Sequence, residues 1–82
     1  MEGKELRKAL IDLGYEVCML RVSDGLVFTL WNGNNMDFVS QFNVSKDIIY
    51  NFKYLGSFED LKKLMVVLEG YQNEQEKVQL HS

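Results

Sequence analysis

Proline is absent from this chain of 82 residues, and cysteine and histidine occur once each. The single thiol, Cys18, cannot form an internal disulfide, and one cysteine with one histidine cannot supply the ligands of a zinc or iron–sulfur site. No apolar run approaches the roughly 18 residues of a membrane-spanning helix, and the N-terminus lacks the basic and apolar segments of a secretion signal. These absences predict a cytoplasmic protein that holds no metal and contacts no membrane.

Acidic and basic residues are interspersed and leave no surface of a single sign. Twelve Asp and Glu residues stand against nine Lys and Arg residues, which gives a net charge of -3. Between residues 15 and 55 the bases are Arg21, Lys46 and Lys53. Nucleic-acid-binding surfaces need clustered bases, because phosphate contacts supply most of the affinity. The composition therefore disfavours a nucleic acid as the partner.

The apolar and charged fractions, 46% and 26%, are those of an ordinary folded domain. A chain of this length has room for one hydrophobic core. We therefore expect residues 1–82 to form a single domain. Within it, residues 71–82 are rich in Gln, Asn, Glu and Lys, which predicts a weak helical extension or a frayed end.

Helical spacing of apolar residues predicts an amphipathic helix at each end of the chain. The first covers residues 4–13 and ends before Gly14, a residue that suits the left-handed conformation after a helix. The second begins after Ser57, a preferred N-cap residue, with the acids Glu59 and Asp60 in its first turn. The apolar faces consist of Leu6, Ala9, Leu10 and Leu13 in the first helix and Leu61, Leu64, Met65 and Leu68 in the second.

Between the helices the apolar period changes to two, which is typical of strands. Three such segments cover residues 15–22, 26–31 and 36–44. They are separated by the turn sequences Ser23-Asp24-Gly25 and Asn32-Gly33-Asn34-Asn35, whose residue types favour tight connections. Three consecutive antiparallel strands are therefore expected. In the third, the residues predicted to share one face are Met36, Phe38, Phe42 and Val44, opposite Asp37, Gln41 and Asn43.

The segment 46–55 fits two structures. Isoleucine and aromatic residues favour a strand, whereas Ser45 and Gly56, as helix caps, favour a short helix. We favour the strand. The expected fold is then α+β, an antiparallel three- or four-stranded meander flanked by an N-terminal and a C-terminal helix. The residues that alternate as in a strand are Ile48, Tyr50, Phe52 and Tyr54, and those with helical spacing are Ile48, Ile49, Phe52 and Leu55.

The predicted core combines the apolar faces of both helices with one side of the sheet. Cys18 is expected to be buried as well, because free cysteine is among the most buried residue types. The core residues that we expect are Leu6, Leu10, Leu13, Val17, Met19, Phe28, Leu30, Phe38, Phe42, Leu61, Leu64, Met65 and Leu68.

Residues that could carry catalysis are few and scattered. His81 lies next to the end of a polar tail, where nothing would fix its orientation. Asp24, Asp37 and Asp47 stand near turns, where aspartate usually hydrogen-bonds its own backbone. The glycines form no phosphate-binding loop. We therefore predict a protein that is not an enzyme, with no catalytic residue and no cofactor.

The predicted sheet region contains more large apolar residues than two helices can cover. Seven aromatic residues lie in the segment 28–54, and both sides of the first two strands carry apolar groups. Either the tail or the fourth element shields the second face, or an apolar patch stays exposed and contacts a partner. In the second case the expected contact residues are Val27, Trp31 and Val39, together with Asp24 and Asp37 at the hairpin turns.

Three functions are compatible with such a surface. The first, which we favour, is a protein-binding module that acts by covering a partner, a nuclease or a regulator. The second is a single-stranded nucleic-acid-binding module in which sheet aromatics stack on bases. The third is a homodimer whose sheets pair across the exposed face, and it is compatible with either of the others.

Three short motifs occur along the chain: the helix sequence Leu6-Arg7-Lys8-Ala9-Leu10, the strand start Gly14-Tyr15-Glu16-Val17 and the hairpin Asn32-Gly33-Asn34-Asn35. With a Ser-capped last helix, this layout resembles small phage-encoded anti-CRISPR proteins, which inhibit type II effector nucleases. The resemblance implies an inhibitor of a bacterial defence nuclease. Some of these proteins mimic DNA with a strongly acidic face. Here the acids Glu59-Asp60 are followed within one turn by Lys62-Lys63, so DNA mimicry is not expected.

Overall fold

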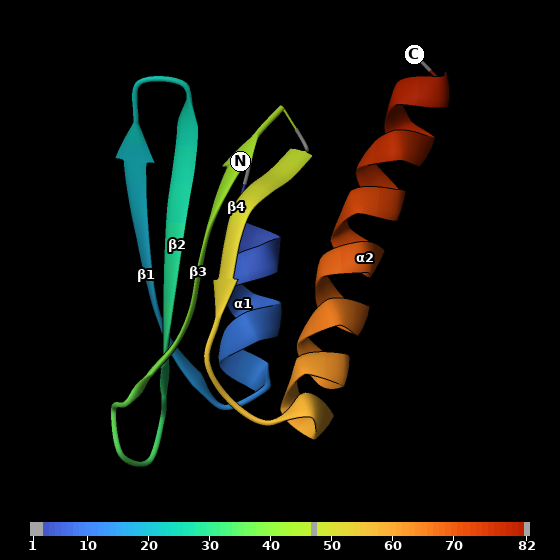
Figure 1. Ribbon diagram of the computed structural model, residues 1–82. Coiled ribbons are helices and arrows are strands. Elements are labelled where there is room, and N and C mark those ends of the chain that lie inside the picture. The colour runs from blue at the N-terminus through green and yellow to red at the C-terminus, as the bar shows by residue number, and fades with distance from the viewer. Residues whose placement is uncertain (1–2, 47, 82) are drawn as a thin grey trace.

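The computed structural model describes residues 3–46 and 48–81, with side chains up to residue 72. Consecutive strands pair antiparallel as a meander, in the order β1-β2-β3-β4 (Figure 1). The predicted α+β fold is confirmed, and the ambiguous segment 46–55 contains the fourth strand. The elements of the described chain are α1 (Lys4–Asp12), β1 (Tyr15–Val22), β2 (Gly25–Asn32), β3 (Phe38–Ser45), β4 (Ile48–Tyr54) and α2 (Phe58–His81).

Both helices lie on the same face of the sheet (Figure 1). α1 packs against β1, and α2 packs against α1 and β4. Together they bury a single core, in which Phe28 and Phe42 stack with ring centroids 5.3 Å apart. Burying a large apolar side chain contributes about 1.5 to 3 kcal/mol, so this core is the main source of stability. Its residues are Leu6, Leu10, Leu26, Phe28, Leu30, Val39, Phe42, Val44, Leu64, Leu68 and Tyr71.

α1 is positioned by a glycine at each end. Gly3 precedes it with φ 87°, and a Cβ at Gly3 would lie 2.6 Å from Cδ1 of Leu26. Only a residue without a side chain fits between α1 and the sheet at this point. Gly14 follows the helix with φ 104°, and its N–H donates to the Ile11 carbonyl at 2.9 Å. The predicted end of the first helix at Gly14 is therefore confirmed.

α2 begins at the predicted cap. The Oγ of Ser57 accepts a hydrogen bond from the N–H of Asp60 at 3.1 Å, which satisfies one of the free donors of the first turn. The helix continues past Gly70 to its last described residue, so the segment 71–82 is helical up to that point. Its first residue, Tyr71, belongs to the core. Among the described residues, neither α2 nor α1 combines the length and apolarity needed to cross a membrane.

A one-residue bulge in β3 decides which of its side chains enter the core. Leu30 pairs with Ser40. The next residue of β2, Trp31, pairs with Phe38, so Val39 is an extra residue without a partner in β2. Val39 is 8% exposed and belongs to the core, whereas Phe38 is 38% exposed and shares the opposite side with Trp31. The predictions that Val39 is part of an exposed patch and that Phe38 is in the core are therefore both wrong.

The core also differs from the prediction at its margins. Leu13 and Met65, both expected in the core, are exposed. Cys18, expected as a buried thiol, is exposed because it pairs with Thr29 on the side of the sheet away from the helices. The core residues that the prediction omits are Leu26, Val39, Val44 and Tyr71.

Candidate functional site

The side of the sheet away from the two helices forms one continuous surface, which we call the outer face. Side chains alternate along a strand and cross-strand partners lie on the same side, so the register of the sheet assigns the members of this surface. They form four rows that run across the strands. The rows are Glu16, Trp31 and Phe38; Cys18, Thr29, Gln41 and Lys53; Leu20, Val27, Asn43 and Tyr50; and Val22, Gly25, Ser45 and Ile48.

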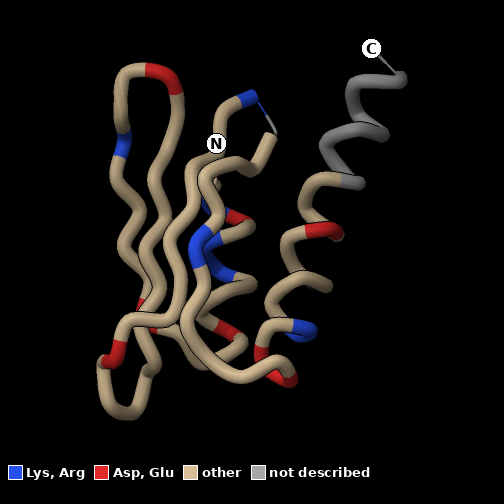
Figure 2. Tube along the Cα trace, in the orientation of Figure 1, with Lys and Arg blue, Asp and Glu red and all other residues tan. Residues whose placement is uncertain are grey.

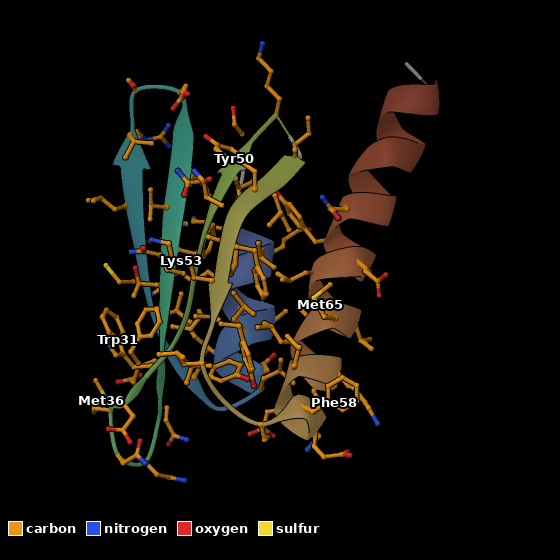
Figure 3. All side chains as sticks on the ribbon, viewed as in Figure 1. Trp31, Met36, Tyr50, Lys53, Phe58 and Met65 are labelled. Carbon is orange, nitrogen blue, oxygen red and sulfur yellow. The ribbon has the colours of Figure 1, made fainter. Side chains whose placement is uncertain are left out.

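Apolar side chains occupy much of the outer face. Leu20 is 60% exposed, Phe38 is accessible beside the half-buried Trp31, and Val27 is half-buried. Figure 3 shows Trp31 and Met36 projecting on the side opposite the helices. Antiparallel sheets with one face in water usually alternate apolar residues inward and polar residues outward. The outer face departs from this pattern in the way that interaction surfaces do.

Neither of the segments that could have shielded the outer face covers it. The tail continues α2 on the helix side, and β4 extends the sheet as an edge strand (Figure 1). The aromatic residues of the sheet divide accordingly. A chain of ring contacts joins Phe28, Phe42, Phe52 and Tyr54 on the helix side, and the aromatic residues of the outer face are Trp31, Phe38 and Tyr50.

Polar and charged groups accompany the apolar residues of the outer face. In its centre, Nε2 of Gln41 donates to Oγ1 of Thr29 at 3.2 Å. Among the described members of the surface the charged ones are Glu16 and Lys53, which lie on the two edge strands. One base is too few to follow a phosphate backbone. A carboxylate and an amine at opposite edges of a sheet are also too far apart to act on one reacting group.

The two acids predicted to contact a partner lie at opposite ends of the sheet. Asp24 is in the β1–β2 turn, and Asp37 is in the β2–β3 loop (Figure 2). The loop is held in shape by side chains: Oδ1 of Asn32 accepts the N–H of Asn34 at 2.8 Å, and Oδ1 of Asn35 accepts the N–H of Asp37 at 3.0 Å. The structure therefore brings the predicted apolar contacts of β2 together on one surface but separates the predicted acids.

A cleft that sequence analysis did not identify lies where the start of β1 meets the end of β4 and the first turn of α2. Its volume is about 340 Å³, and its walls include Tyr15, Tyr54 and Asp60. Burial raises the pKa of the Tyr54 phenol above its ordinary value of 10.0, and the Asp60 carboxylate adds to the shift. Burial also raises the pKa of Tyr15, with contributions from Tyr54 and then Asp60.

These raised pKa values keep both phenols of the cleft protonated at neutral pH, so neither can act as a base there. The hydroxyl of Tyr54 donates to the Ser57 carbonyl at 2.7 Å, which ties the end of β4 to the start of α2. Tyr54, at the wall of the cleft, therefore helps to place α2. The cleft could not be predicted from a sequence motif, because Tyr15, Tyr54 and Asp60 come from three separate elements.

A smaller groove, of about 190 Å³, lies between β4 and α2. Its apolar walls include Phe52 and Met65, each 38% exposed, and the core residue Leu68. Glu69 and Gln72 also line it. The groove lies on the helix side of the sheet and is separate from the outer face, so two different apolar surfaces remain accessible on the molecule.

The described residues contain no group of three or more His, Cys, Asp and Glu side chains that could hold a metal ion. Asp24 and Asp37 are separated by the whole length of β2 and cannot act as a catalytic pair. Asp47 and the side chain of His81, the other catalytic candidates of the sequence, lie outside the described residues.

No protein-family model, curated protein or solved structure matches this chain. No residue role is therefore transferred from a relative, and the resemblance in layout to anti-CRISPR proteins stays a prediction. The accessible surfaces of the molecule, above all the outer face, are therefore the basis for proposing a function.

Proposed function

We propose that this chain is a protein-binding module of the cytoplasm, without enzymatic activity, that occupies the surface of a partner with its outer face. The observation that carries the proposal is the one-sided packing of the sheet. Both helices cover one side, while Leu20, Trp31 and Phe38 stay accessible on the other. Aromatic side chains, above all Trp and Tyr, contribute a large share of the binding energy of protein interfaces.

The outer face has the size of a small interface. Four strands about 4.8 Å apart and about eight residues long, at about 3.4 Å per residue, give a flat footprint of about 500 Å². Specific interfaces bury about 800 Å² of accessible surface on each partner, and the accessible area of a side-chain surface exceeds its flat footprint. Met36 of the β2–β3 loop is 55% exposed and projects on the same side (Figure 3), so it extends this surface. The outer face is therefore large enough for a small specific interface.

A single-stranded nucleic acid is the weaker candidate. Trp31, Phe38 and Tyr50 could stack on nucleobases. Among the described outer-face residues, however, the positive charge comes from Lys53, and the negative charge of Glu16 offsets it. Proteins that bind single strands combine stacking with a positive groove. Titrating the fluorescence of Trp31 with an oligonucleotide at low salt tests this alternative, and saturable quenching at micromolar concentration would favour it over a protein partner.

The resemblance in layout makes a type II effector nuclease the first partner to test. In the proposed mode the chain covers a surface that the nuclease needs and forms a stoichiometric complex. Cleavage of target DNA should then fall in proportion to the added protein until one equivalent is present. A loss of cleavage that needs a large excess of protein, or no loss at all, would exclude this partner.

The role of the outer face is tested with two lysine substitutions at sites of similar exposure. Leu20 on the outer face is 60% exposed, and Val66 on α2 is 69% exposed. We expect Leu20→Lys to abolish partner binding, because it places a charge in the apolar part of the contact, and Val66→Lys to retain it. Equal binding by both variants would show that another surface is used and would overturn the proposal.

A further inference from the structure

The charged residues of the outer face lie on opposite edge strands and in adjacent rows. Glu16 on β1 shares a row with Trp31, and Lys53 on β4 shares the next row with Gln41. Successive residues on one side of a strand are about 7 Å apart, a distance that a lysine side chain spans. An acid at one edge and a base at the other make the outer face complementary to itself.

We propose that the outer face binds a second copy of this chain, with the two sheets packed face to face around a twofold axis parallel to the strands. The inference rests on the proposed function, because it names one partner for the same surface. An axis along the boundary between β2 and β3 places β1 over β4 of the second copy and β2 over β3. Face-to-face sheets pack about 10 Å apart with nearly aligned strands, which matches this arrangement.

Under this axis each row of the outer face meets the same row of the second copy. Trp31 faces Phe38 of the second copy, and Phe38 faces Trp31, so aromatic rings meet on both sides of the axis. The next row brings polar side chains against polar side chains. At the edges, Glu16 comes within one row of Lys53 of the second copy, and the symmetry repeats this pair.

The same charges disfavour the other axis that could bring two outer faces together. A twofold axis perpendicular to the strands places β1 over β1 and β4 over β4, so Glu16 would share an edge with Glu16 of the second copy and Lys53 with Lys53, and no opposite-charge pair would form. Arg21 does not alter this balance, because it pairs with Leu26 and lies on the helix side. Asp37 lies in the β2–β3 loop, at the boundary between the two halves, and adds charge to neither edge.

The area of the outer face predicts a reversible dimer. A flat footprint of about 500 Å² per copy lies at the low end for specific interfaces, where weak and transient complexes are found. Any other protein that uses the outer face then competes with the second copy. The outer face therefore becomes available to that protein when the concentration of this chain falls below the Kd of the dimer.

Charge reversal tests the pairing, because it predicts opposite results for separate and mixed variants. Glu16→Lys alone puts lysine against Lys53 of the second copy at both edges, and Lys53→Glu alone puts glutamate against Glu16. Each variant alone should dimerise at least about tenfold more weakly than the wild type. An equimolar mixture restores an opposite-charge pair at both edges. It should form a heterodimer with a Kd close to that of the wild type, measured by sedimentation velocity with one variant fluorescently labelled.

The double variant Glu16→Lys/Lys53→Glu is the matched control, since it restores both pairs within one sequence and should dimerise like the wild type. Circular dichroism checks that every variant is folded. A wild-type chain that stays monomeric up to about 0.5 mM overturns the inference, as does a mixture that does not associate. Neither result bears on the proposed function, which fails separately if Leu20→Lys and Val66→Lys bind a different partner equally well.

Discussion

Trp31 and Phe38 lie opposite each other across the β2–β3 ladder, although a register continued from the Leu30–Ser40 pair would place Val39 there. The bulge moves one apolar side chain to each side of the sheet. Val39 completes the core, and Phe38 joins Trp31 on the outer face. A single backbone irregularity therefore contributes both to the stability of the domain and to the surface that we propose for docking.

Truncating the two residues at the bulge should separate stability from binding. Val39→Ala removes buried methyl groups and leaves a cavity, so we expect the free energy of unfolding to fall by about 2 kcal/mol. Phe38→Ala should lower it by less, because this ring is 38% exposed, and should weaken partner binding by about tenfold or more. Urea denaturation and a binding titration measure the two effects. A larger stability loss for Phe38→Ala would contradict the assigned register.

Adjacent residues of α2 provide a second comparison of core and surface. Leu64 is 0% exposed and Met65 is 38% exposed, at the rim of the groove beside β4. Leu64→Ala should lower the free energy of unfolding by about 2 to 5 kcal/mol, because its cavity lies in the middle of the core. Met65→Ala should cost less than about half of that, since its side chain already meets water. Equal losses in urea denaturation would show that α2 packs with a different face.

Periodicity predicted the elements because each period follows from backbone geometry alone. The expected segments 4–13, 15–22 and 26–31 lie within a residue or so of α1, β1 and β2. The segment 46–55 remained ambiguous, since its apolar residues match both periods, and pairing with β3 makes it a strand. Strand pairing is a tertiary effect that local spacing does not contain.

The composition of the outer face could be predicted only in part. Val27 and Trp31 were identified because both sides of β2 are apolar. A period of two cannot reveal a one-residue bulge in an apolar segment. The sequence therefore assigns Phe38 to the core and Val39 to the exposed side, the reverse of what the structure shows. It also cannot decide which apolar side of β1 meets the helices, and for this reason Cys18 was expected to be buried.

Raising the pH above about 10 should destabilise the protein through Tyr15 and Tyr54. Burial, with the nearby Asp60 carboxylate, raises the pKa of both phenols above 10.0 in the folded chain. The folded chain therefore keeps protons that the unfolded chain has already released, so the stability present below this pH falls as the pH rises through the folded pKa values. Phenolate absorbance and urea denaturation measure the two effects. Asp60→Asn should lower both pKa values, and unchanged titration curves would contradict the cleft geometry.

Gly70→Ala should stabilise the protein. α2 runs through Gly70, which is exposed, and a Cβ there would meet no atom within 4 Å. Because glycine loses more conformational entropy than alanine in a helix, the free energy of unfolding should rise by about 0.5 to 1 kcal/mol. Gly3→Ala is the matched control and should be destabilising, since its Cβ would collide with Leu26. A neutral or destabilising Gly70→Ala in thermal denaturation would mean that α2 is interrupted there.

Dilution should shift the fluorescence of Trp31, the only tryptophan of the chain, if the second copy binds as proposed. Its ring is partly accessible in a single chain and would face Phe38 of the second copy in the dimer, so the emission maximum should move to longer wavelength as the dimer dissociates. Leu20→Lys should emit at the longer wavelength at every concentration, and Val66→Lys should follow the wild type. The midpoint should agree with the Kd from sedimentation, because both measure one equilibrium. Emission that does not depend on concentration, in a chain that sediments as a dimer, would place the contact on another surface, with the groove between β4 and α2 as the next to test.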